Sequence, residues 1–226
     1  MIGIIGAMAP EMALLEAALQ EKQERTAAGM TFRTGTLSGR DVVILQCGVG
    51  KVNAAVGAAL LIEWFHPTAV LNTGSAGGLL PNQTFGDTVV STAVVHHDVD
   101  VTAFGYVVGQ VPGLPPTFPS DPALVALAVR CLEGVAHTTG VIGSGDVFVH
   151  DAEVIARIRR RFPELCAVEM EAAAIAQVCH LTSTPFVVVR ALSDIAGKES
   201  PMKFDEFLPL ASKNSSRLVL DMLKNL

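Results

Sequence analysis

The chain has 226 residues, half of them hydrophobic and 17% charged, as expected of one α/β domain over residues 1–226 with a large core. Its formal net charge of −6 at pH 7 argues against binding to nucleic acid. The apolar runs are too short to span a bilayer, no basic segment precedes the first of them, and the four cysteines form no CxxC pair. We therefore expect a cytoplasmic protein that does not bind membranes.

The N-terminal stretch predicts a buried strand and then a helix. Residues 2–5 are apolar and lead to Gly6, and Pro10 suits the first turn of a helix. Glu11 lies one short turn beyond the tip of this strand. Its function stays open at this point, because the helix dipole also stabilises an acidic residue in a first turn.

Two further apolar runs, residues 30–35 and 41–47, flank a turn and predict a hairpin. The second run leads into the Gly-Val-Gly-Lys turn at 48–51 and a predicted helix over 52–65. This turn is not a phosphate-binding Walker loop, because Leu45 stands where the first glycine would be.

A glycine-rich loop is predicted at residues 73–78, after a short strand over 69–72. Such a loop lets a ligand approach the backbone closely, and Ser75 offers a hydroxyl there. The segment is not a hydrolase nucleophile elbow, because Thr73 stands where that motif has glycine.

Metal-ligating residue types follow a predicted strand over residues 87–95. They are His96, His97 and Asp98, but adjacent side chains on a strand point to opposite faces. We therefore expect no metal site. The next segment, 101–120, is a long apolar loop that predicts a subunit interface reaching a pocket, or a loop packed on its own domain.

The second half alternates helices with apolar strands. We expect helices at 121–132, 152–162, 172–179 and 204–226, strands at 138–142, 166–168 and 186–189, and a polar loop at 197–201. The basic run at 157–161 is interpreted as the solvated face of a helix.

Glu169 and Glu171 lie where one of these strands turns into a helix. Because an unpaired carboxylate is costly to bury, we expect polar groups to meet them. The alternative is an acidic first turn that the helix dipole stabilises.

Alternating apolar strands and helices imply a three-layer α/β/α fold with a central mixed, largely parallel sheet. Ligands of such sheets bind outside the carboxyl ends of the strands. The residues at these ends combine three carboxylates, one hydroxyl and several apolar groups, and Arg190 is the one strong candidate for phosphate. This chemistry favours a neutral, partly apolar ligand with hydroxyls, cleaved by acid/base catalysis.

Eight motifs occur in order along residues 2–220: IGIIGAM, CGVGKVNAA, NTGSAGGL, HHDVDVTAFGY, GSGDVF, VEMEAAAIA, VVVRALSD and FDEF. Together they resemble the bacterial 5′-methylthioadenosine/S-adenosylhomocysteine nucleosidases of the purine nucleoside phosphorylase superfamily. The resemblance implies a cytoplasmic homodimer without a cofactor. It also implies hydrolysis of both nucleosides, and of 5′-deoxyadenosine, to adenine and a 5-substituted ribose in methionine salvage.

The same resemblance implies a role for each matching residue. Asp194 would protonate adenine N7, Glu11 would activate water, and Glu171 would accept hydrogen bonds from the ribose hydroxyls. An acid of this kind needs a raised pKa, which burial would supply. The remaining substrate-binding residues would be Met170, Ser75, Arg190, Ser193, Phe148, Val149, Met8, Val49, Gly77 and Phe204. A partner subunit would add Val101, Phe104 and Pro112.

Three alternatives stay open. A nucleoside phosphorylase would need several arginines near the first strand, where this chain has Glu11. Cleavage of aminodeoxyfutalosine would use the same catalytic groups, and a binding protein would have lost catalysis. The departures from the family pattern are Pro10, Val49, where isoleucine is common, and His150, where asparagine is usual.

Overall fold

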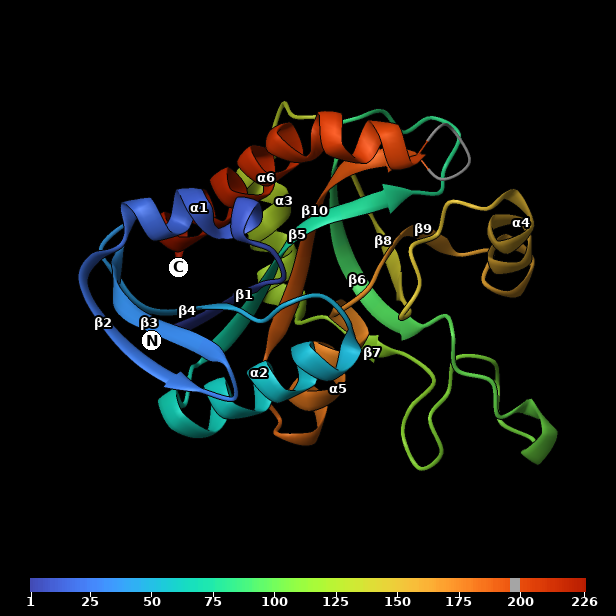
Figure 1. Ribbon diagram of the computed structural model, residues 1–226, viewed down its shortest axis with the longest axis horizontal. Helices are drawn as coiled ribbons and strands as arrows, with labels where there is room; N and C mark the ends of the chain where they lie inside the picture. The colour runs from blue at the N-terminus through green and yellow to red at the C-terminus, as the bar shows by residue number, and fades with distance from the viewer. Residues whose placement is uncertain (196–199) are drawn as a thin grey trace.

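The computed structural model describes residues 1–195 and 200–226, and the strands within them form one mixed sheet (Figure 1). The strand order is β10-β6-β8-β9-β5-β1-β4-β3-β2, with β7 paired to β6. The strands are β1 (Ile2–Gly6), β2 (Gln20–Ala27), β3 (Met30–Leu37), β4 (Arg40–Gln46), β5 (Ala69–Gly78), β6 (Thr88–His96), β7 (Phe118–Pro119), β8 (His137–Ser144), β9 (Leu165–Glu169) and β10 (Phe186–Ile195). Because β10 also pairs with β5, five strands close into a ring.

The inner strands run mostly parallel. β1 is parallel to β4 and β5, β5 to β10, and β8 to β6 and β9, whereas β2–β3–β4 and the β5–β9 and β6–β10 pairs are antiparallel. The parallel strands therefore bring several carboxyl ends to one edge of the sheet, where a ligand site is expected.

Helices cover both faces of the sheet. One core cluster contains side chains of α1 (Ala9–Ala18), α3 (Pro122–Cys131) and α6 (Ser200–Asn225). A second contains side chains of α2 (Lys51–Phe65) and α5 (Ala172–Leu181), on the other side of the strands in Figure 1. The amphipathic α4 (Ala152–Arg161) packs on a smaller cluster at the end of the sheet. The predicted three-layer fold with a mixed sheet is confirmed.

One strand was not predicted, and two others run further than predicted. The polar segment Gln20–Ala27 forms an edge strand on β3, although its residues are almost all exposed. Residues 73–78 were expected to be a loop, but they continue β5. Strand β10 likewise runs on from the predicted 186–189 to Ile195. The physical reason is that the two extensions pair with each other, with Gly74 beside Arg190 and Gly77 beside Asp194.

The polar loop expected at 197–201 falls partly on 197–199, which lie outside the described residues, and α6 begins at Ser200 rather than Phe204. Residues 101–117 contain a single 3₁₀ turn, Thr102–Phe104, and project away from the sheet at the lower right of Figure 1. Among the described residues, no helix is long and apolar enough to cross a membrane.

Candidate active site

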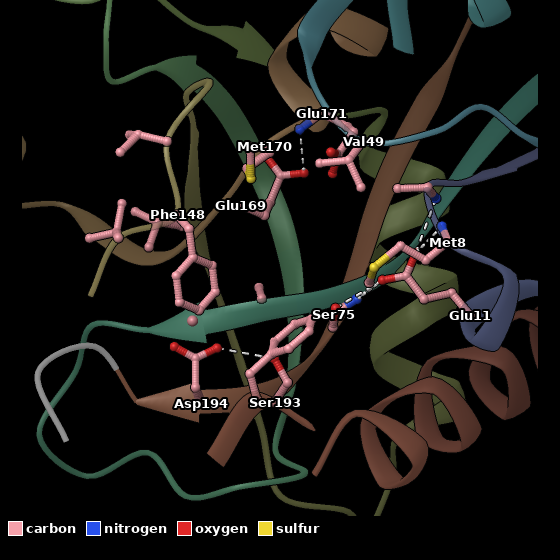
Figure 2. A pocket seen from close by; sticks show the side chains of 17 residues that line it. Met8, Glu11, Val49, Ser75, Phe148, Glu169, Met170, Glu171, Ser193 and Asp194 are labelled. Carbon is pink, nitrogen blue, oxygen red and sulfur yellow. Dashed lines mark hydrogen bonds between the residues drawn. The ribbon is translucent and has the colours of Figure 1, made fainter. Parts of the chain in front are cut away.

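A cavity of about 270 Å³ opens at the carboxyl ends of β1, β5, β8, β9 and β10. Figure 2 shows its lining side chains converging from these strands and from α1 and α6. The lining residues are Ala7, Met8, Glu11, Val49, Ser75, Ala76, Gly77, Val147, Phe148, Val149, Val168, Glu169, Met170, Glu171, Ser193, Asp194 and Phe204. Every site residue predicted within this subunit is among them except Arg190.

Glu11 is held at one side of the cavity by four hydrogen bonds. Its Oε2 accepts from the backbone N–H groups of Ala7 (3.1 Å) and Met8 (2.9 Å) at the start of α1. Its Oε1 accepts from the backbone N–H (2.8 Å) and the hydroxyl (2.9 Å) of Ser75 on β5. Gly74 leaves room for the Glu11 carboxylate, because a Cβ at this position would clash with Oε1 at 2.8 Å. The buried carboxylate is therefore fixed in one position.

Glu171 lies at the N-cap of α5, between strand β9 and the helix, and its side chain faces the cavity. Its Oε1 accepts a hydrogen bond from the backbone N–H of Gly50 at 2.8 Å, which is the polar partner the sequence led us to expect. Burial, together with the nearby charge of Glu169, raises the pKa of Glu171 to about 8.

Glu169 forms the polar floor of the cavity, and no role for it was predicted from the sequence. Its Oε2 accepts hydrogen bonds from the N–H groups of Glu171 (3.0 Å) and Ala172 (2.8 Å) and from Nη2 of Arg190 (2.7 Å). The same Nη2 donates to Oδ1 of Asn72 at 2.7 Å. Arg190 was expected to support the water and the ribose hydroxyls, but its guanidinium is turned to these two partners beneath the cavity. That role stays a prediction.

Asp194 lies near the end of β10 and is 3% exposed. The Ser193 hydroxyl donates a hydrogen bond to its Oδ1 at 3.1 Å. Gly77 on the neighbouring strand faces the carboxyl group, since a Cβ there would lie 3.0 Å from Oδ2. Figure 2 shows Asp194 below Phe148, with Glu11 at the other end of the cavity and Glu171 across from both. A molecule between them would meet carboxyl groups on three sides.

The rest of the cavity is apolar. The rings of Phe148 and Phe204 meet edge to face, with centroids 5.7 Å apart, and Met8, Met170 and Val49 complete the wall. Aromatic and thioether groups of this kind suit a flat heterocycle and an alkyl chain. With the carboxylates, the cavity can hold a heterocycle joined to a hydroxylated ring and cleave the bond between them by acid/base catalysis.

The residues predicted to reach a partner subunit lie away from this cavity. Val101, Phe104 and Pro112 are on the projecting loop, and Phe104 is 81% exposed. Their place in a partner's pocket stays a prediction. Of the two histidines weighed as metal ligands, His96 is hydrogen-bonded to Gln177 and His97 packs on Gly145. Within the described ranges, no group of three His, Cys, Asp or Glu side chains is placed to hold a metal ion.

A family model described as the phosphorylase superfamily matches residues 1–224. The 5′-methylthioadenosine/S-adenosylhomocysteine nucleosidase of Geobacillus thermodenitrificans is 55% identical over 223 residues, which cover 97% of this chain and 94% of the relative. The chain belongs to this nucleosidase family within the phosphorylase superfamily. The resemblance carried by the eight motifs is therefore confirmed.

Solved structures agree with this assignment. The nucleosidase of Colwellia psychrerythraea in complex with adenine is 51% identical, with a TM-score of 0.97 and coverage of 100% of this chain and 95% of that one. The futalosine hydrolase of Helicobacter pylori is 32% identical, with a TM-score of 0.94 and coverage of 100% and 97%. A hydrolase named for a different substrate thus has the same fold as this chain.

Proposed function

We propose that this protein hydrolyses the N-ribosidic bond of 5′-methylthioadenosine and S-adenosylhomocysteine, and also of 5′-deoxyadenosine. The products are adenine and the 5-substituted ribose, and no cofactor takes part. In the cell this reaction would serve methionine salvage and remove the product of methyl transfer, in the cytoplasm.

The observation that carries this proposal is the fixed carboxylate of Glu11. A phosphorylase must bind phosphate beside the sugar, which requires free N–H donors or cationic side chains. Here Glu11 already occupies the N–H groups of Ala7, Met8 and Ser75, and none of the lining residues described above is Lys or Arg. A carboxylate at this point repels phosphate and can accept a proton from water.

The mechanism follows from the three carboxyl groups. Asp194 donates its proton to N7 of the purine, and the electron pair of the breaking N9–C1′ bond passes to the base, which leaves as neutral adenine. The ribosyl group acquires oxocarbenium character, as in other glycoside hydrolyses. Water adds to C1′ and transfers a proton to Glu11, while Glu171 accepts hydrogen bonds from the 2′ and 3′ hydroxyls.

The remaining residues have supporting roles in this proposal. Phe148 stacks on the adenine, whose edge the Val149 backbone reads, and Met170 lies beneath the sugar. Ser193 holds Asp194, whereas Ser75 and Arg190 support the water and the ribose hydroxyls. Met8, Val49 and Phe204 line the sugar and the 5′ group.

We also propose a homodimer in which Val101, Phe104 and Pro112 enter the partner's pocket. The support is the exposed apolar surface of the projecting loop, on which Phe104 and Val107 are 81% and 54% exposed. Side chains of this size exposed close together are typical of an interface. Sedimentation of the wild type and of Phe104→Ser tests this: a monomeric wild type would contradict it.

The deciding experiment is an assay of 5′-methylthioadenosine with and without phosphate that follows adenine and the sugar product. Adenine and free 5-methylthioribose at equal rates in both conditions are expected. Strict dependence on phosphate, with a sugar 1-phosphate as product, would contradict hydrolysis. Comparison of kcat/KM for S-adenosylhomocysteine and aminodeoxyfutalosine then ranks the 5′ groups. Aminodeoxyfutalosine is included because a futalosine hydrolase has the same fold.

A further inference from the structure

Two consecutive N–H groups at the start of α2 hold carboxylates from two different parts of the chain. The N–H of Gly50 donates to Oε1 of Glu171 at 2.8 Å, and the N–H of Lys51 donates to Oδ1 of Asp146 at 2.7 Å. Glu171 faces the proposed ribose site, and Asp146 lies two residues before Phe148, which faces the proposed adenine site. The first turn of α2 thus links the two halves of the cavity.

Asp146 belongs to a closed ring of hydrogen bonds. Its own backbone N–H donates to Oδ2 of Asp98 at 3.0 Å, and Oδ1 of Asp98 accepts from Nζ of Lys51 at 2.6 Å. The backbone N–H of Lys51 donates to the Asp146 carboxylate and closes the ring. The ring therefore joins three segments that lie far apart in sequence: α2, the turn after β6, and the loop between β8 and α4.

The segment that carries Phe148 is hydrogen-bonded to other described segments through this ring. From Asp146 to His150, all hydrogen bonds to other segments of the described chain are made by Asp146. The others are local, such as the one from the Val147 N–H to the Gly145 carbonyl. The contact with α2 is close, because a Cβ on Gly50 would lie 3.2 Å from Oδ1 of Asp146. A charge-assisted bond to a helix N-terminus is a strong tether for such a loop.

We propose that Asp146 is a positioning residue for the purine base. By binding the N–H next to the one that holds Glu171, it sets the distance between Phe148 and the ribose carboxylate. Lys51 and Asp98 keep it in place. The proposal rests on the proposed function for the identity of the base, but it assigns Asp146 no part in proton transfer.

The test compares Asp146→Ala with Asp146→Asn. Asparagine keeps an Oδ1 acceptor for the Lys51 N–H, whereas alanine leaves that donor and the loop without their bond. For Asp146→Ala we expect the calorimetric Kd for adenine and the KM for 5′-methylthioadenosine to rise about tenfold or more, with kcat within about twofold of wild type. Asp146→Asn should restore both constants to within about threefold of wild type.

Asp151→Ala is the matched control. Asp151 lies in the same connection but caps α4 through the N–H groups of Glu153 and Val154, so its loss should lower the Tm without changing the Kd for adenine. Lys51→Met is a second variant that removes the ammonium but keeps the backbone donor, and it should weaken adenine binding less than Asp146→Ala does.

An unchanged Kd for adenine in a folded Asp146→Ala protein would overturn the proposal, and so would equal losses in Asp146→Ala and Asp151→Ala. Calorimetry with adenine needs no turnover, so it tests the positioning role of Asp146 separately from the proposed hydrolysis. A wild type that binds adenine without cleaving 5′-methylthioadenosine would contradict the proposed function, and the Asp146 variants would still decide the positioning role.

Discussion

One oxygen of Glu11 accepts two hydrogen bonds from Ser75, from its backbone N–H at 2.8 Å and from its hydroxyl at 2.9 Å. The first turn of α1 is thereby fixed to the middle of β5, although 64 residues separate the two in sequence. The other oxygen is bonded to N–H groups at the start of α1, so the carboxylate cannot turn without losing bonds. This geometry makes a specific prediction for each partner.

Glu11→Gln should lower kcat for 5′-methylthioadenosine by roughly 10²- to 10⁴-fold, because the amide is no base and its NH₂ group must face an N–H donor. Ser75→Ala keeps the backbone bond and should cost about tenfold or less. Steady-state assays at saturating substrate measure both. Equal kcat values for Glu11→Gln and wild type would remove Glu11 from the water-activating role.

Asp194→Asn should abolish most activity on adenine nucleosides, by roughly 10²- to 10⁴-fold, because the purine then leaves without its proton. The same variant should retain much more activity on a 5-methylthioribosyl 4-nitrophenolate, whose leaving group needs no acid. The ratio of kcat/KM for the two substrates is the measurement. Ser193→Ala, which removes only a hydrogen bond to Asp194, serves as the control; losses of the same size on both substrates would contradict an acid role for Asp194.

The pKa of Glu171 predicts a pH dependence of stability. Burial and the charge of Glu169 raise this pKa from an ordinary 4.5 to about 8 in the folded protein. A group with a raised folded-state pKa contributes stability that is full below pH 4.5 and is lost as pH rises through about 8. Glu171→Gln mimics the neutral form, so its advantage in unfolding free energy over wild type should grow across this window.

Urea unfolding of the two proteins at several pH values tests this prediction. Glu16→Gln is the control, because Glu16 is a partly exposed residue of α1 paired with Arg33, outside the cavity. A difference between wild type and Glu171→Gln that stays constant from pH 4.5 to 8 would contradict the raised pKa.

Arg190 and Glu169 form a buried ion pair, with side chains 2% and 3% exposed. Arg190→Met should lower the unfolding free energy by about 3–5 kcal/mol, because it leaves the Glu169 charge buried without its cation. The double variant Arg190→Met with Glu169→Gln should recover part of this loss. Lys224→Met at the exposed pair with Asp221 should cost less than about 1 kcal/mol. Equal losses of unfolding free energy in Arg190→Met and Lys224→Met would contradict the larger contribution expected of the buried pair.

The sequence alone determined the fold class and most of the cavity. Apolar strands that end in glycine, glutamate or aspartate placed Glu11, Ser75, Glu171 and Asp194 at one edge of a sheet, and the structure brings them together there. For Glu11, Ser75 and Asp194 this works because β1, β5 and β10 are parallel and share the direction of their carboxyl ends. Glu171 joins them because the end of β9 pairs antiparallel with the end of β5. The ordered motifs then identified the family, which the comparisons confirm.

Tertiary structure decided what depends on partners distant in sequence. The glycine-rich end of β5 is a strand because β10 pairs with it, and Gln20–Ala27 is a strand because β3 does, although neither segment has a strand-like pattern of its own. The bonds of Arg190 to Glu169, of Gly50 to Glu171 and of Lys51 to Asp146 likewise join segments 21 to 121 residues apart. Such contacts leave no periodic pattern in the local sequence. They form only when folding buries the charged and polar groups, because each buried group then needs a hydrogen-bond partner.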